Sequence, residues 1–232
     1  MLFDPRRHEP LAGIDWDPAV AAHAIERIAL DTEQRFSPDT FWPVHPLDAE
    51  GADTGPFFNL YFGAGGVVWA LHALQSRRVT GLRRSYGEHL DACMALNRRW
   101  LASQGFADID RASYLMGDTS LLMLRAWLSA GDPRPAQIED LVVRNLDNPA
   151  RELIWGSPGT MLAAMFMHEQ TGDSRWRDLY ATTSRKLWSQ LVHSDETRCN
   201  YWTQDLYGRR YRSSTACTDL SQRARRSPAA AA

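Results

Sequence analysis

Cysteine and histidine side chains are the first candidates for chemistry in this sequence, and their spacing favours no metal or redox site. The three cysteines, Cys93, Cys199 and Cys217, form no CxxC pair, and an odd number does not suit a disulfide framework. Cys199 falls in the polar stretch SDETRCNYW, where we expect a loop and an incidental cysteine. His72 and His168 lie on or next to apolar helical segments, which predicts structural histidines.

Carboxylates are the second group of candidates. Asp118 directly follows Gly117 at the start of an apolar helical run, so we expect it to cap that helix, with a central cavity as the alternative destination of its side chain. Paired carboxylates with tryptophan platforms are also typical of sugar chemistry. The candidate residues for such a site are Asp53, Asp108, Asp110 and Asp118, together with Trp69 and Trp155.

Glycines open three strongly apolar helical stretches. The stretches are LYFGAGGVVWALHAL (60–74), YLMGDTSLLMLRAWL (114–128) and IWGSPGTMLAAMFMHEQTG (154–172). Their opening glycines stand at 63, 117 and 156, with spacings of 54 (117 − 63) and 39 (156 − 117), which indicates a degenerate repeat of helical hairpins. The candidate cavity-lining residues of these motifs are Gly63, Gly65, Gly66, Gly117, Asp118, Gly156, Ser157 and Gly159.

Amphipathic helical segments alternate with these apolar ones. The first begins at Asp17, a predicted N-cap, with Pro18 at the first helical position, and others follow each apolar stretch. Apolar helices packed on both sides and amphipathic helices facing water fit a double layer of hairpins. We therefore predict an all-α chain with very little strand, arranged as an incomplete α/α toroid; an open helical solenoid is the alternative.

These motifs resemble the successive glycine motifs of the lanthionine synthetase C-like family. The resemblance runs from about 57 to 212 and includes YWTQDLYGRRYR (201–212), which is similar to the segment before that family's next motif. It implies a double-layered α/α toroid with a central zinc ion. It also implies zinc-assisted addition of a thiol to dehydroalanine or dehydrobutyrine, which forms a thioether in a peptide. The implied partners are peptides or proteins with dehydrated Ser or Thr, and glutathione-type thiols.

The sequence departs from the family where the zinc ligands should be. The family's Trp-Cys-x-Gly motif and its adjacent Cys-His pair are both missing from this chain. We therefore assign no metal ligand and no catalytic residue, and expect no independent cyclase activity and no cofactor in the chain as it stands. The alternatives are an α/α-toroid glycosidase or sugar epimerase, and a non-catalytic fragment that binds a peptide or a subunit. An uncovered apolar patch of Met161, Leu162, Met165 and Phe166 would favour self-association.

The sequence divides at about residue 212. Residues 1–212 are the partial toroid domain, and 213–232 form an Arg- and Ala-rich tail that we expect to be disordered. Read from the third base of each codon, 215–220 permits a Gly-x-His-Gly motif followed by an apolar residue. We therefore hypothesise that the tail arises from out-of-frame translation.

Bulk composition excludes some classes of function. The chain has 232 residues, 44% of them hydrophobic, and a net charge of −2, which gives no reason to expect a nucleic acid or an anionic membrane as partner. The charged N-terminus lacks the apolar core of a signal peptide, and no apolar run reaches membrane-spanning length. We expect a cytoplasmic protein.

Overall fold

A computed structural model of the chain describes residues 13, 15–45, 55–106, 108–129, 135–203, 205–206 and 209–210. This part of the chain is mostly helical, which confirms the predicted class. Its α-helices are α1 (Pro18–Gln34), α2 (Ala64–Ser76), α3 (Leu90–Ser103), α4 (Asp118–Leu128), α5 (Pro135–Asn145), α6 (Ser157–Thr171) and α7 (Ser174–Ser189). Two 3-10 helices, η2 (Gly87–His89) and η3 (Asp108–Ala112), lie in the connections.

Helix ends follow the signals in the sequence. Asp17 caps α1, because its carboxylate accepts hydrogen bonds from the backbone N–H of Ala19 (2.8 Å) and Val20 (3.2 Å), and Pro18 takes the first helical position. Gly172 ends α6 with φ of 68°, a left-handed conformation that suits glycine. Gly63, Gly117 and Gly156 are the N-caps of α2, α4 and α6.

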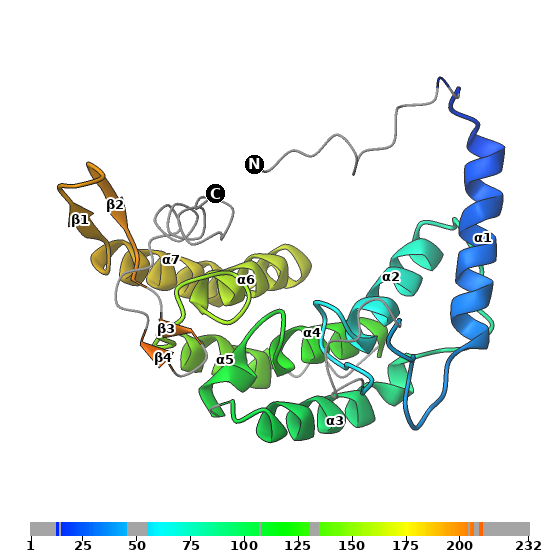
Figure 1. Ribbon diagram of the computed structural model, residues 1–232, viewed down its shortest axis with the longest axis horizontal. Coiled ribbons are helices and arrows are strands. Elements are labelled where there is room, and N and C mark those ends of the chain that lie inside the picture. The colour runs from blue at the N-terminus through cyan, green and yellow to red at the C-terminus, as the bar shows by residue number, and fades with distance from the viewer. Residues whose placement is uncertain are drawn as a thin grey trace, which may run out of the picture.

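The helices pack in two layers. The inner helices α2, α4 and α6 contact one another in that order, and the outer helices α3, α5 and α7 contact the inner helices beside them. Figure 1 shows an arc with α1 and α2 at one end and α6 and α7 at the other. The alternation of apolar and amphipathic helices therefore produces the expected layers, while closure into a ring stays a prediction.

The core fills the space between the two layers. Leu121 of α4, Ile138 of α5 and Trp176 of α7 are 0% exposed. A smaller cluster of Leu101, Met116, Ala150 and Trp155 lies where the inner helices begin. Each helix thus buries an apolar face, as the hydrophobic pattern requires.

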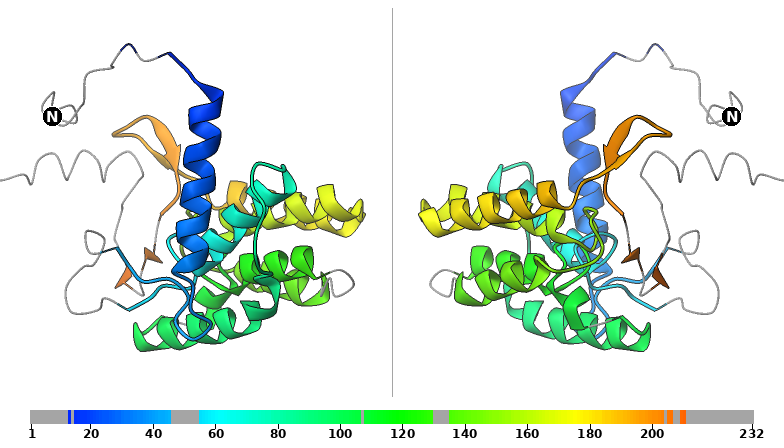
Figure 2. Two further views of the ribbon diagram at one scale, coloured as in Figure 1. Left: turned by 90° about the vertical axis from the view of Figure 1, so that its right-hand side faces the viewer. Right: turned by 90° about the vertical axis from the view of Figure 1, so that its left-hand side faces the viewer.

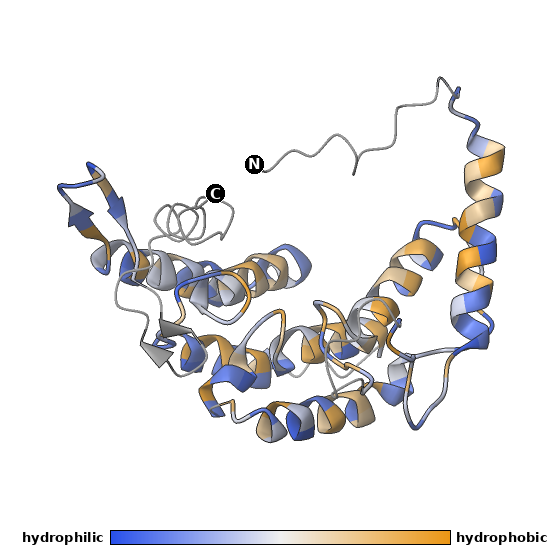
Figure 3. Cartoon of the chain, viewed as in Figure 1, coloured by the Kyte–Doolittle hydropathy of each residue, from blue (hydrophilic) through white to orange (hydrophobic). Residues whose placement is uncertain are grey.

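The inner helices are less buried than their composition predicts. Trp69 is 50% exposed, Trp127 44% and Phe166 38%, so the expectation of burial on all sides is wrong. The reason is that no described helix covers the side of the inner layer that faces away from α3, α5 and α7. Met161, Leu162 and Met165 are half-buried and lie beside Phe166 on α6, where the sequence places an apolar patch. Figure 3 shows apolar residues along α2, α4 and α6.

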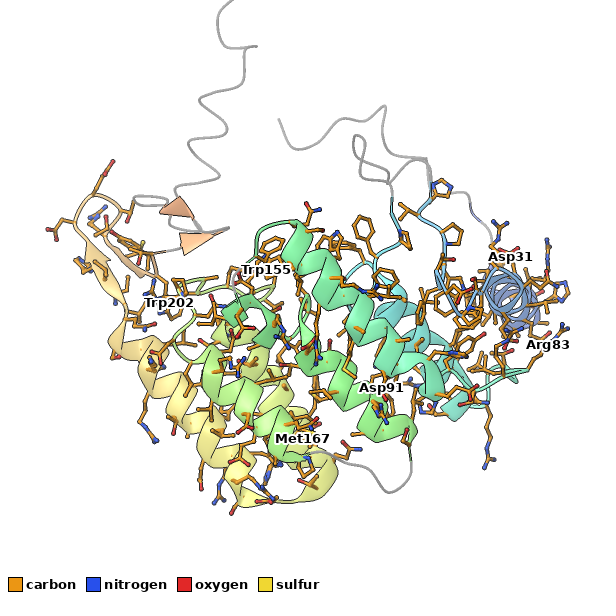
Figure 4. All side chains as sticks on the ribbon, turned by 90° about the horizontal axis from the view of Figure 1, so that it is seen from below. Asp31, Arg83, Asp91, Trp155, Met167 and Trp202 are labelled. Atoms are coloured by element: carbon orange, nitrogen blue, oxygen red, sulfur yellow. The ribbon has the colours of Figure 1, made fainter. Side chains whose placement is uncertain are left out.

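Helix α1 is held to the body at its C-terminal end. The buried carboxylate of Glu33 accepts hydrogen bonds from the backbone N–H of Arg83 (2.9 Å) and from the hydroxyl of Tyr86 (3.3 Å). Trp42 also donates its indole N–H to the carbonyl of Thr32 at 2.7 Å. Arg83 lies beside α1 in Figure 4, and Figure 2 shows the rest of α1 extending beyond the other helices.

Two short hairpins contradict the expectation of a loop around Cys199. Strand β1 (Val192–Ser194) pairs antiparallel with β2 (Cys199–Tyr201), and β3 (Asp205–Leu206) pairs with β4 (Arg209–Arg210). Arg198 has φ of 51°, a left-handed turn conformation that lets the chain reverse before β2. Strands of two or three residues are too short to show an alternating pattern, so the sequence carries no signal for them.

Some of the sequence-based expectations concern parts of the chain that the structure does not describe. The tail 213–232, Cys217 and Asp53 all lie outside the described residues. Within the described residues, no helix combines the length and apolar character needed to cross a membrane.

Candidate functional site

Three loops that enter the inner helices have the same construction. We call them the first (57–63), second (111–117) and third (150–156) glycine loops. In each, the side chain of the third residue accepts a hydrogen bond from the backbone N–H three residues further on. This hydrogen bond stabilises the turn that precedes the glycine. The donor–acceptor pairs are Phe62 N to Asn59 Oδ1 (3.0 Å), Met116 N to Ser113 Oγ (3.0 Å) and Trp155 N to Glu152 Oε1 (2.6 Å).

The glycine that ends each loop is required by space. A Cβ atom would lie 2.3 Å from the carbonyl oxygen of Arg111 at Gly117, and 1.7 Å from that of Ala150 at Gly156. Both glycines have extended backbones, with φ of −99° and −91°, that any residue adopts. The same approach recurs one turn later, where a Cβ at Gly66 or Gly159 would lie 2.4 Å from the carbonyl oxygen of Leu60 or Leu153.

The three loops contact one another at one end of the helix layers. The backbone N–H groups of Leu60 and Tyr61 donate to the carbonyl of Leu115 at 3.1 and 3.2 Å. The hydroxyl of Ser113 donates to the carbonyl of Ile154 at 2.7 Å. The loops therefore form one continuous surface that spans the starts of α2, α4 and α6.

Buried asparagines of the outer helices hold two of these loops. Asn97 of α3 donates its side-chain amide to the carbonyl of Met116 at 2.8 Å, and Asn145 of α5 donates to that of Trp155 at 3.2 Å. Both asparagines are 0% exposed, and each contacts the residue directly before a capping glycine. Neither asparagine was identified as a candidate from the sequence, although an asparagine on the apolar face of an amphipathic helix is an available signal.

A cavity of about 710 Å³ lies beside the first glycine loop. Aromatic side chains from three segments form its wall: Trp42, Phe57 and Phe62, and Trp100 at the end of α3. The remaining lining residues are Pro43, Val44, His45, Gly63, Ala64, Val67 and Gln104. None of these described lining residues carries a carboxylate, an ammonium or a guanidinium group.

Contacts between aromatic rings connect the cavity to the third glycine loop. Phe57 packs edge-on against Phe62 (4.6 Å between ring centroids) and Trp100 (5.7 Å). Phe106 lies 6.0 Å from Trp100 and stacks on Trp155 at 4.4 Å. Trp155 is labelled in Figure 4 at the loop end of the molecule. The cavity wall is therefore part of an aromatic row rather than an isolated group of side chains.

Backbone N–H groups at the start of α2, beside the cavity, already donate hydrogen bonds to the protein's own carbonyl groups. The N–H of Ala64 donates to the carbonyl of Phe57 at 2.9 Å, and the N–H of Gly65 donates to that of Phe58 at 3.2 Å. These bonds take up donors that an anion would otherwise bind. The cavity therefore suits an uncharged, largely apolar group.

Asp118 neither caps α4 nor reaches the cavity. Its carboxylate lies 2.7 Å from Nε of Arg98 on α3 and 3.4 Å from a terminal nitrogen of Arg111, and its side chain is 1% exposed. Gly117 is the N-cap, and Asp118 makes no capping hydrogen bond, so the capping prediction is wrong. Burial raises the pKa of Asp118, and the two arginines oppose that shift. Asp118 joins the inner layer to the outer layer.

The other candidates are distributed over separate places. His168 contacts the carbonyl of Asp173 at 3.0 Å, as expected for a structural histidine. His72 packs edge-on against Trp127 at 4.7 Å, and burial lowers the pKa of His72. Asp108 forms ion pairs with Arg111 and Arg144. The cavity is not lined by any of the described candidates for sugar chemistry, which are Asp108, Asp110, Asp118, Trp69 and Trp155. The structure therefore does not bring these side chains together at the cavity.

The described residues do not fit a zinc site. Cys93 is buried in α3 and donates its thiol to the carbonyl of Phe58 at 3.2 Å, whereas Cys199 lies on β2. Among the described residues, no three His, Cys, Asp or Glu side chains are grouped so that they could hold a metal ion. We therefore assign no zinc-dependent step to the residues that the structure describes.

Cys93 is expected to resist alkylation in the folded protein. Burial raises the pKa of its thiol to about 12, so only a very small fraction is thiolate at neutral pH. Iodoacetamide should modify Cys93 about 100-fold or more slowly in the native chain than in urea. Peptide mapping by mass spectrometry measures this ratio, and comparable rates in both conditions would show that the core around Cys93 is open.

Comparisons with protein-family models, curated proteins and solved structures found no match to the chain. The resemblance to the lanthionine synthetase C-like family therefore rests on the glycine motifs quoted above. The equivalent hydrogen bonds of the three glycine loops are a separate observation, and they establish a structural repeat within this chain.

Proposed function

We propose that this chain is a lanthionine synthetase C-like helical-hairpin protein that binds an uncharged peptide segment at its glycine-loop end. The observation that carries the proposal is the aromatic cavity beside the first glycine loop. The cavity lies at the mouth of an inner helix, on the continuous surface that the three loops form.

The dimensions and chemistry of the cavity support an apolar occupant. Its volume of about 710 Å³ falls in the range of roughly 300–1,000 Å³ that is typical of ligand sites. Four aromatic side chains supply the wall, and His45 and Gln104 supply polar edges. Burial of a charged group against such a wall would cost several kcal/mol of solvation, so charged segments should be rejected.

Exposed apolar residues on neighbouring loops favour an extended ligand. Tyr61 is 58% exposed and Phe62 47%, both in the first glycine loop, and Leu153 of the third loop is 47% exposed. A peptide that places one side chain in the cavity could therefore continue across this surface. The role that we propose for this chain is to hold the substrate, because the thiol-addition step of the family uses Trp-Cys-x-Gly and Cys-His ligands that this sequence lacks.

Titration with short peptides tests the proposal. Two tryptophans line the cavity, so their fluorescence should change when an uncharged peptide with an aromatic residue next to dehydrobutyrine is added. The substitution Phe62→Ala removes one ring of the wall and should weaken binding about tenfold, equivalent to about 1.4 kcal/mol. Tyr180→Ala is the matched control, since Tyr180 is an aromatic residue of similar exposure (40%) on α7 that neither lines the cavity nor lies on a glycine loop.

Several outcomes would contradict peptide binding. Equal affinity of Phe62→Ala and the unaltered protein would show that the cavity is not the site. Equal affinity for an acidic peptide of the same length would remove the argument from desolvation. A fluorescence response to oligosaccharides alone would favour the carbohydrate alternative instead.

A further inference from the structure

Two apolar surfaces lie uncovered within the described part of the chain, and neither belongs to the aromatic cavity. The first, which we call the arm stripe, consists of Trp16 (80% exposed), Val20 (65%) and Ile28 (65%) on and before α1. The second, which we call the inner face, lies on α2, α4 and α6. It consists of the exposed Trp69, Trp127 and Phe166 and the half-buried Met123, Leu162 and Met165.

We propose that the chain forms a symmetric dimer in which α1 of each copy packs its arm stripe against the inner face of the other copy. This inference does not depend on peptide binding, because none of the residues in the two surfaces lines the cavity. It gives both uncovered surfaces one occupant, a second copy of this chain.

The geometry of α1 directs Val20 away from its own body and places Ile28 about 100° from the buried Ala29. The buried residues of α1 are Ala29 and Glu33, and the contacts of Glu33 with Arg83 and Tyr86 fix that side of the helix. Val20 precedes Ala29 by nine residues, which places it on the opposite side at about 100° per residue. While the Glu33 contacts hold, α1 projects from the body as an arm (Figures 1 and 2).

The inner face has the chemistry of a groove for an amphipathic helix. Its side chains are aromatic, thioether or aliphatic, and flexible methionines adapt to the shape of a partner. His72 packs against Trp127 at 4.7 Å between ring centroids, which joins the α2 and α4 parts of the surface. Burial lowers the pKa of His72 and so favours its uncharged form. Glu169, four residues after Met165, is exposed at the edge of this face, so an apolar stripe on a helix meets one carboxylate there.

The exposed area is sufficient for a stable dimer. Large aromatic side chains bury about 150–250 Å² each, so the exposed fractions of the four aromatic residues give roughly 320–530 Å². Val20 and Ile28 raise the total for one arm stripe and one inner face to about 500–700 Å². Two symmetric contacts would bury about 1,000–1,400 Å², at the lower end of the range of about 1,200–2,000 Å² for specific interfaces. A symmetric exchange satisfies both surfaces in both copies and closes the assembly at two chains.

Mass measurement by size-exclusion chromatography with light scattering tests the dimer. The unaltered chain should be dimeric at tens of micromolar. The double substitution Val20→Glu with Ile28→Glu should give monomers, and so should Phe166→Glu on the inner face, because each buries a charge in both contacts. Ala22→Glu is the control, since it adds the same charge to an exposed position about 200° from Val20 and should leave the dimer intact.

Hydrogen exchange of the unaltered chain gives a second test that needs no variant. Amides of α1 and α6 should exchange at least several-fold more slowly above the concentration of dimer formation than below it. A monomer at all concentrations would overturn the proposal. A dimer that survives Phe166→Glu but not the arm substitutions would also overturn it, because that result means that the arms pair with each other. Exchange of α1 that does not change with concentration would do the same.

Discussion

Alanine at position 156 is expected to lower the free energy of unfolding by about 3–5 kcal/mol, or to prevent folding altogether. The added Cβ would lie 1.7 Å from the carbonyl oxygen of Ala150 and 3.0 Å from that of Glu152. Both obstacles are backbone atoms of the third glycine loop, and they cannot move without loss of hydrogen bonds. The bonds at risk are Gly156 N to Glu152 O at 3.0 Å and Ala150 N to Asn148 Oδ1 at 2.9 Å.

Urea unfolding followed by circular dichroism measures this effect. Gly81→Ala is the matched control, because Gly81 is exposed and a Cβ there meets nothing within 4 Å. That control should change the free energy of unfolding by less than about 0.5 kcal/mol. A loss below about 1 kcal/mol for Gly156→Ala would mean that the third loop is not packed on α6 as described.

Local signals made the helices and their ends predictable from the sequence. Asp17 with Pro18 marks the start of α1, and Gly172 marks the end of α6, because each acts within one helical turn. The opening glycines were also identified, and the structure gives close approach of the backbone as the reason for them. Alternation of apolar and amphipathic segments predicted the layers, since each amphipathic helix buries its apolar face against an apolar helix.

Contacts between distant positions were not predictable. Asp118 looked like a cap because it stands at the start of its own helix, whereas its carboxylate pairs with Arg98, which reaches it from α3. The aromatic cavity combines Trp42 with Trp100, and aromatic residues fill cores as readily as they line sites. The exposure of Trp127 was missed because composition cannot tell whether a second layer of protein covers an apolar helix.

The buried asparagines explain how the layers set the position of the glycine loops. Hydrogen bonds from Asn97 and Asn145 fix the carbonyls of Met116 and Trp155, the residues that precede two capping glycines. A loop held in this way has little freedom to shift when its own side chains change. The outer helices therefore determine the shape of the surface on which we place peptide binding.

Loss of the Asn145 side chain should therefore destabilise the third glycine loop from a distance. Asn145→Ala leaves the buried carbonyl of Trp155 with one donor fewer and removes the acceptor of the Asn148 amide, which lies at 2.9 Å from Asn145 Oδ1. We expect a loss of about 2–3 kcal/mol in the free energy of unfolding. Urea unfolding measures it, and Gln137→Ala, at an exposed amide on the same helix, should be nearly neutral.

An isosteric substitution separates the hydrogen bond from the volume of the side chain. Asn145→Asp keeps the size of the residue but replaces the amide donor by an oxygen facing the carbonyl of Trp155, 3.2 Å away in the native protein. If the hydrogen bond is what holds the loop, Asp should destabilise at least as much as Ala, because two acceptors then face each other in a buried place. If Asp is tolerated and only Ala is harmful, packing volume holds the loop and the hydrogen-bond argument fails.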